Sequence, residues 1–205
     1  DGFEEVKSSQ LKNIHLYVNG QDLGTIQGDG RDAPILGTLN KVQNMTVDTT
    51  KAFTMGTTTL NDAANVTVSG TASTSSATFS TLGAVGLTHD VNLTATGLKT
   101  GLNFTSIDAA SGSITLTATN LEGNLNASGA TPALKTKTGK INVDVSNAKG
   151  SVNLGALETD GSGDVTLNAS STVGAVKTGV ITGNNVTING QGALGGVVVG
   201  TGLGD

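Results

Sequence analysis

Residues 113–121 read Ser-Ile-Thr-Leu-Thr-Ala-Thr-Asn-Leu, and close variants of this stretch recur along the chain. The other copies are Asn65-Val-Thr-Val-Ser-Gly, Asp90-Val-Asn-Leu-Thr-Ala, Lys140-Ile-Asn-Val-Asp-Val, Asp164-Val-Thr-Leu-Asn-Ala and Asn185-Val-Thr-Ile-Asn-Gly. Their first aliphatic residues are separated by 25, 23, 27, 24 and 21 residues, and a seventh copy starts at Met45. Within each copy, apolar and polar residues alternate with a period of two, which is typical of a β-strand with one buried face.

The copies also agree beyond this strand. When the first aliphatic residue is position zero, positions +2 and +11 are aliphatic in every copy, and positions +4, +13 and +16 are mostly apolar or small. Copies stacked about 4.8 Å apart would place equal positions above one another and fill the interior with files of Val, Leu and Ile. The sequence therefore predicts an all-β fold, a parallel β-solenoid (β-helix) of about six to seven coils of about 24 residues each.

The winding hand of the solenoid and the alternative of a β-sandwich can both be judged from general rules of β-structure. Right-handed winding is expected because connections between parallel strands of one sheet are nearly always right-handed. An antiparallel β-sandwich would also show short strands and frequent turns, but it does not require matching columns at one period.

The repeat divides the chain into two parts. Residues 41–205 form the predicted solenoid domain, and residues 1–40 fall outside the pattern. An open solenoid end exposes unpaired strand edges, and solenoids therefore end in caps. We expect residues 1–40 to be an N-terminal cap or a junction to a preceding domain.

Composition limits the classes of function. The 205 residues include 30 Gly and no Cys or Trp, only 13% are charged, and the net charge is −5. An acidic chain lacks the basic face that nucleic-acid binding needs. No run of about 18 apolar residues exists, so the sequence predicts no membrane span. The chain starts at Asp1 without a signal peptide, and we interpret it as the mature form or a fragment of something longer.

One loop has the composition of a calcium site. Asp160, Ser162 and Asp164 place two carboxylates and a hydroxyl at alternate positions between glycines, which suits the oxygen ligands of Ca²⁺. The stretch from Gly28 to Asp32 is a weaker version. Asp and Gly also form turns without any metal, so both interpretations stay open. No other cofactor is predicted to be required.

Catalytic signals are weak. His15 and His89 have no nucleophile and orienting acid in a shared motif, and the carboxylates are scattered over different columns. A polysaccharide lyase or hydrolase on a solenoid would need clustered acids or arginines on one face. The sequence therefore predicts no catalytic residues and no enzyme activity.

Polar side chains between the aliphatic positions are expected to form an outward face. The row at position +1 holds Thr67, Asn92, Thr115, Asn142, Thr166 and Thr187. Stacked Thr and Asn side chains suit a solvated sheet and can hydrogen-bond along the stack. Such a face could also bind ice or a glycan, which is the alternative function to a structural role.

The chain resembles bacterial surface-layer (S-layer) proteins in three features: its Thr-, Ala- and Asn-rich strands, such as those that begin at Ser113 and Asp164, its absence of Cys and its acidic composition. The nearest are those of Campylobacter-type bacteria, which are secreted by a type I route. The resemblance covers residues 41–205 and implies a lattice-forming coat, often calcium-dependent, on the cell surface. It implies self-association, with a cell-surface glycan or lipopolysaccharide as a further partner. We therefore expect an extracellular structural protein, either an S-layer subunit or an adhesin stalk.

Overall fold

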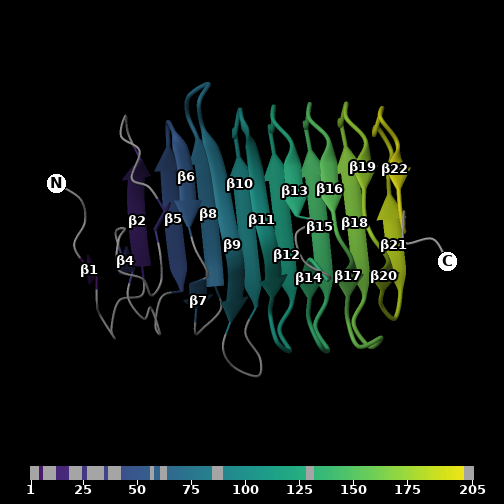
Figure 1. The fold of residues 1–205 in the computed structure, drawn as a ribbon. Coiled ribbons are helices and arrows are strands. Elements are labelled where there is room, and N and C mark those ends of the chain that lie inside the picture. Colours follow the sequence, from purple (N-terminus) through teal and green to yellow (C-terminus); the bar gives the residue numbers. More distant parts are fainter. Residues whose placement is uncertain are drawn as a thin grey trace.

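A computed structural model describes residues 5–6, 13–18, 25–26, 35–36, 43–55, 58–60, 64–84, 90–127 and 132–200. These residues are all-β, and their parallel strands stack into a β-solenoid of about six turns (Figure 1). The predicted fold class is therefore confirmed. The strands run across the long axis, so successive coils lie side by side from the N-terminal end to the C-terminal end.

The first sheet contains one strand from each coil. Its strands, in spatial order, are β2 (Asn13–Val18), β5 (Asn44–Thr49), β8 (Ala64–Gly70), β10 (Val91–Thr96), β12 (Ile114–Thr119), β15 (Ile141–Ser146), β18 (Val165–Ser170) and β21 (Val186–Asn189). Spatial order follows chain order, and every pair is parallel. Strand β2 lies within residues 1–40, so this sheet extends into the segment that the sequence assigns to a cap.

The second sheet closes each coil on the opposite side (Figure 1). Its strands are β3 (Thr25–Ile26), β6 (Ala52–Met55), β7 (Thr58–Leu60), β9 (Ser76–Ala84), β11 (Gly101–Asp108), β13 (Leu125–Ala127), β14 (Leu134–Lys135), β16 (Val152–Leu154), β17 (Leu157–Glu158), β19 (Val176–Lys177), β20 (Ile181–Thr182) and β22 (Val197–Val198). Strands β9 and β11 each cross the whole sheet, whereas later coils cross it with two short strands. Apart from both sheets, β1 (Glu5–Val6) pairs with β4 (Ile35–Leu36).

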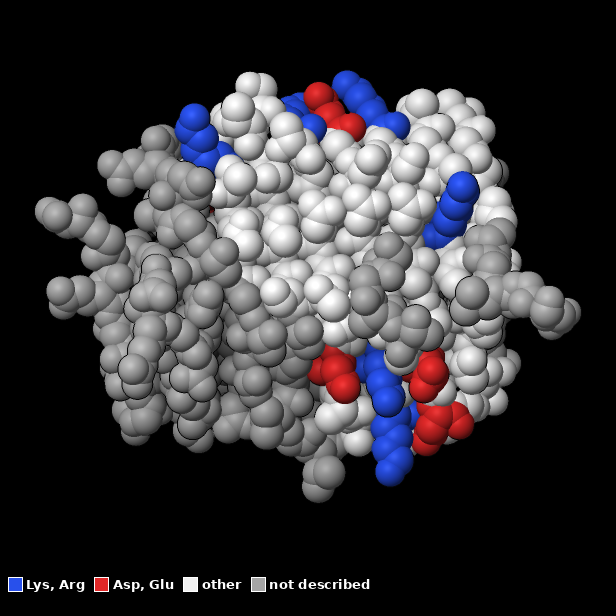
Figure 2. All heavy atoms as spheres, viewed as in Figure 1, with Lys and Arg blue, Asp and Glu red and all other residues white. Residues whose placement is uncertain are grey.

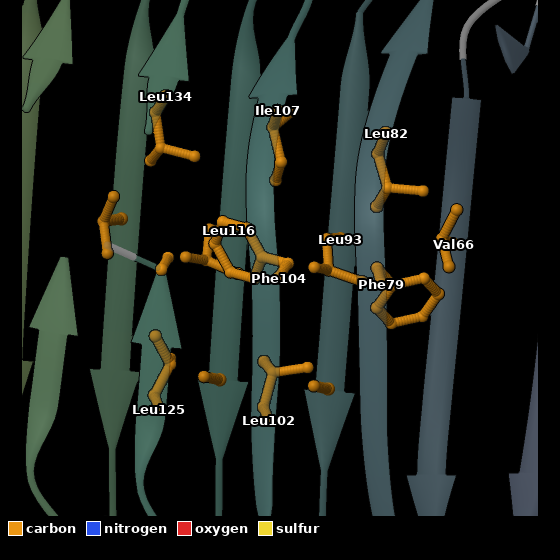
Figure 3. Packing of buried hydrophobic residues seen from close by; sticks show 14 of the residues in the cluster. Val66, Phe79, Leu82, Leu93, Leu102, Phe104, Ile107, Leu116, Leu125 and Leu134 are labelled. Carbon is orange, nitrogen blue, oxygen red and sulfur yellow. The ribbon is translucent and has the colours of Figure 1, made fainter. Parts of the chain in front are cut away.

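Aliphatic files fill the space between the sheets. Val91, Ile114, Ile141 and Val165 pair in register and are almost completely buried, as the repeat predicts. From the second sheet, Leu102 and Leu125 form part of a parallel file, and Figure 3 shows these side chains between the sheets. The described Phe and Tyr rings, Tyr17, Phe53, Phe79 and Phe104, all lie between β2 and β11. Phe53 and Phe79 meet there edge to face, with ring centroids 5.8 Å apart.

The predicted register is wrong for the early coils. Val91 pairs with Ala64 and not with Val66, and Leu93 is the neighbour of Val66. The true repeat therefore starts two residues earlier there. Side chains on a strand alternate between faces with a period of two, so a shift of two residues keeps every apolar side chain inside. Alternation alone cannot detect such a shift.

One column of the second sheet also differs from the prediction. Ile107 pairs with Leu134, which in turn pairs with Leu157. Position +16 counted from Ile114 is Ala130, so a constant spacing places Ala130 in this file. The connection before β14 is longer, so the aliphatic residue of this file is Leu134, four residues further along the chain. The pattern of buried residues does not determine the length of a loop, so the sequence pattern could not predict this difference.

A left-handed corner follows five strands of the first sheet: β10, β12, β15, β18 and β21. The residue six positions after the start of the strand has a positive φ in five successive coils: Gly97 (69°), Asn120 (56°), Asn147 (50°), Ser171 (51°) and Gly192 (84°). Gly and Asn tolerate this conformation better than other residues. The corner turns the chain toward the second sheet at the same place in each coil.

A second corner depends on the absence of side chains. A Cβ atom added to Gly139 would lie 2.0 Å from the carbonyl oxygen of Gly112. A Cβ atom added to Gly163 would lie even closer to the backbone of Gly139. Backbones of neighbouring coils therefore touch at this corner, and only glycine fits between them.

Candidate functional site

The outer face of the first sheet carries an asparagine ladder. Asn13, Asn44, Asn65 and Asn92 occupy one row on successive coils. Each side-chain amide donates to the side-chain carbonyl of the preceding coil, over 2.8, 3.1 and 2.8 Å. A similar bond runs from the side-chain amide of Asn189 to the side-chain carbonyl of Asn168 on this face. The ladder supplements the backbone bonds along the axis and fixes the orientation of the amides.

Five of the six residues of the predicted outward row lie in register. Asn92, Thr115, Asn142, Thr166 and Thr187 follow one another in register. Thr67 belongs to a neighbouring row, and this error follows from the two-residue register shift in β8. The correction produces a file of four threonines on consecutive strands: Thr46, Thr67, Thr94 and Thr117.

At the N-terminal end of the outer face, three side chains form a cluster that we name the Tyr17 cluster: Tyr17, His15 and Asp48. The His15 Nε2 lies 2.6 Å from Asp48 Oδ2, and the Tyr17 hydroxyl lies 3.1 Å from His15 Nδ1. The His15 and Tyr17 rings stack with centroids 4.1 Å apart. Alternation in β2 places His15 and Tyr17 outward, but their neighbour Asp48 comes from the next coil. Only the register between coils could reveal this contact.

In the loop predicted to bind calcium, both carboxylates accept hydrogen bonds from the protein. Asp160 Oδ1 accepts hydrogen bonds from Ser162 N (3.0 Å) and Ser162 Oγ (2.5 Å), which closes the turn on itself. Asp164 Oδ1 accepts from the backbone N (3.1 Å) and side-chain amide (3.0 Å) of Asn185 in the next coil. No group of three or more His, Cys, Asp or Glu that could hold a metal exists among the described residues. Residues 28–32 and His89 lie outside these residues.

Both carboxylates are stabilised in their charged form. Hydrogen bonds from Ser162 lower the pKa of Asp160, and hydrogen bonds from Asn185 lower the pKa of Asp164. Each is therefore ionised at neutral pH. Asp164 joins adjacent coils, a role that the sequence pattern of Asp and Gly does not reveal.

In the described part of the face in Figure 2, most charged side chains lie along the upper and lower edges. One charged row crosses three coils. Glu122 Oε1 lies 2.5 Å from Lys99 Nζ and 3.3 Å from Lys149 Nζ. The hydrogen bond from Lys99, followed by that from Lys149, lowers the pKa of Glu122. The continuation of this row is apolar, with Val173 and Leu194 exposed.

The last described coil, with β21 and β22, exposes aliphatic side chains, and we name this surface the C-terminal layer. Val186 and Ile188 continue buried files of the first sheet, yet their exposed fractions are 45% and 39%. Among the described residues, seven of the eight exposed large hydrophobic side chains lie between residues 173 and 199. At the opposite end, Leu16 and Val18 of β2 are buried. The two ends of the first sheet therefore differ in exposed apolar surface.

Comparison with protein-family models, with curated protein sequences and with solved structures finds no match to this chain. In the part of the chain that the structure describes, no helix is long and apolar enough to cross a membrane.

Proposed function

We propose that the chain is an extracellular structural component of a bacterial cell-surface layer or of a surface adhesin stalk, acting by self-association of a rigid β-solenoid. The observation that carries this proposal is the uncovered C-terminal layer, in which inward-facing aliphatic side chains are exposed. Contiguous exposed apolar surface is typical of association sites. Backbone pairing through the whole first sheet supports the rigidity that a scaffold needs.

The partner we propose for this layer is the C-terminal layer of a second copy. The inward side chains Leu16 and Val18 at the N-terminal end are buried, so this end does not present a matching apolar surface. The C-terminal layer of a second copy does present one. Two copies related by a twofold axis would pair β21 with β21 in antiparallel fashion and cover Val186 and Ile188. Exposed strand edges favour such pairing.

Sedimentation velocity over a concentration series tests the proposal. We expect a dimer in the parent chain, and we expect Ile188→Lys to weaken dimerisation by at least about tenfold because it places a charge in the interface. Thr187→Lys is the matched control, because it adds the same charge on the outward side of the same strand. A monomer at every concentration, or equal effects of both variants, would overturn the proposal. Circular dichroism checks that both variants retain the fold.

Surface location needs a separate test. Protease treatment of intact cells of the source organism, followed by mass spectrometry, should release peptides of this chain before those of cytoplasmic proteins. Electron microscopy of the purified protein with and without calcium then tests for sheets or fibres. Peptides recovered solely after cell lysis would contradict the surface role.

A second candidate function is ice or glycan binding by the outer face, and the threonine file favours it. Thr46, Thr67, Thr94 and Thr117 repeat on consecutive strands about 4.8 Å apart. Measurement of thermal hysteresis separates ice binding from a purely structural role. Thr94→Lys should abolish any thermal hysteresis. If the parent chain shows no thermal hysteresis, ice binding is excluded.

A further inference from the structure

Among the described Phe, Tyr and Trp side chains, Tyr17 alone is exposed, with an exposed fraction of 61%. It does not contribute to the core, because Leu16 and Val18 on the same strand are the buried residues. Its in-register neighbour on β5 is Asp48, which is followed in the same row by Ser69. No bulky side chain in this row packs over the ring.

The ring is nevertheless held in place. His15 covers one side of it by stacking, and His15 is itself bonded to Asp48. If neutral His15 donates its Nε2 proton to Asp48, its Nδ1 accepts a hydrogen bond from the Tyr17 hydroxyl. A solvent-exposed aromatic ring in a fixed orientation offers contact area at little cost in conformational entropy.

The surroundings define the chemistry of a ligand. The row that starts at Tyr17 continues through Asp48, Ser69, Thr96 and Thr119, one hydrogen-bonding side chain per coil. None of the described outward positions of the first sheet is Lys or Arg. A polyanion would meet Asp48 and no compensating cation, whereas a neutral polyhydroxylated chain would meet acceptors and donors at each step along the axis.

We propose that the Tyr17 cluster is a binding site for a neutral oligosaccharide. The apolar C–H face of one sugar ring would pack on the exposed side of Tyr17, and its hydroxyl groups would hydrogen-bond to Asp48 and Ser69. Further sugar units would extend along the row toward Thr96. The site lies at the end of the outer face opposite to the uncovered C-terminal layer, so it is independent of the proposed self-association.

The chain provides its own probe for this site, because it contains one Tyr and no Trp. Tyrosine fluorescence therefore reports on Tyr17 alone. Cellohexaose, maltohexaose, mannohexaose and the hexamer of N-acetylglucosamine would be titrated separately, each in parallel with isothermal titration calorimetry. We expect a saturable change in emission and a measurable heat with at least one of these neutral hexasaccharides.

Variants locate the binding. Tyr17→Ala should weaken the calorimetric affinity by at least about tenfold, as loss of a central aromatic contact does. Asp48→Asn should also weaken it, and Tyr17→Phe should retain most of it because the ring remains. Ser170→Ala, at the far end of the same row, is the control and should leave affinity unchanged. Thermal unfolding of each variant confirms that the fold is intact.

Several outcomes would overturn the site. They are no saturable binding of any of the four hexasaccharides, unchanged affinity in Tyr17→Ala, or binding of heparin in their place. The sedimentation behaviour of Tyr17→Ala is expected to match that of the parent chain. If the glycan site is refuted, the self-association proposal is therefore unaffected. If self-association is refuted, the glycan site is likewise unaffected.

Discussion

Replacement of Thr172 by Val should stabilise the protein. Thr172 lies in the buried column that follows the left-handed corner, where the equivalent residues are Leu98, Leu121, Ala148 and Ala193. Its hydroxyl oxygen is buried and has no hydrogen-bond partner in the described structure. An unsatisfied buried hydroxyl costs about 1–3 kcal/mol. Valine has nearly the same shape and places a methyl group there, so we expect a gain of about 1–3 kcal/mol.

Thermal unfolding followed by circular dichroism measures this gain. A chain of this size should show a rise in Tm of about 2–4 °C for each kcal/mol. Thr136→Val is the matched control: Thr136 is equally buried, but its hydroxyl donates to the carbonyl of Gly112, so its loss should lower Tm. An unchanged or lowered Tm in Thr172→Val would refute the reasoning, as would a rise of equal size in the control.

Three further changes have definite expected results. Gly139→Ala should cost about 3 kcal/mol or more in chemical denaturation, because its Cβ would overlap the backbone of Gly112 in the preceding coil. Gly161→Ala has open space around it and should cost about 1–2 kcal/mol for its positive φ alone. Ala110→Gly should raise stability by about 0.5–1 kcal/mol, since Ala110 adopts φ 52°. Asp164 has a lowered pKa, so the stability from its bonds to Asn185 is present at neutral pH and is lost as the pH falls below its unfolded value of about 3.9. Between pH 7 and pH 3 the Tm of Asp164→Asn should therefore fall less than that of the parent chain, and an equal fall would contradict this.

The repeat in the sequence was sufficient for the fold, because each coil must bury its own apolar face. Ile114, Ile141 and Val165 recur with the same alternation, and a stack of parallel coils places such positions above one another. The register was less certain. Val66 and Ala64 both point inward, so a sequence alignment could exchange them without exposing any apolar group.

The candidate sites were predicted less completely than the fold. The outward Thr and Asn row followed from alternation, and the structure moved Thr67 alone to another row. The left-handed corners were visible in principle as a column of Gly, Asn and Ser six positions after each strand start. The contact between His15 and Asp48 joins residues 33 positions apart, and the bonds from Asn185 to Asp164 join residues 21 positions apart, so no local sequence pattern indicates either of them.

The sequence by itself determined that the chain folds as stacked strands and which side of each strand faces the interior. Those properties depend on the alternation of apolar and polar residues within one coil. The tertiary structure alone decided which residue of one coil lies beside which residue of the next, where backbones touch so closely that only glycine fits, and which layer remains uncovered. These properties depend on the lengths of the connections between strands, which the buried files do not constrain.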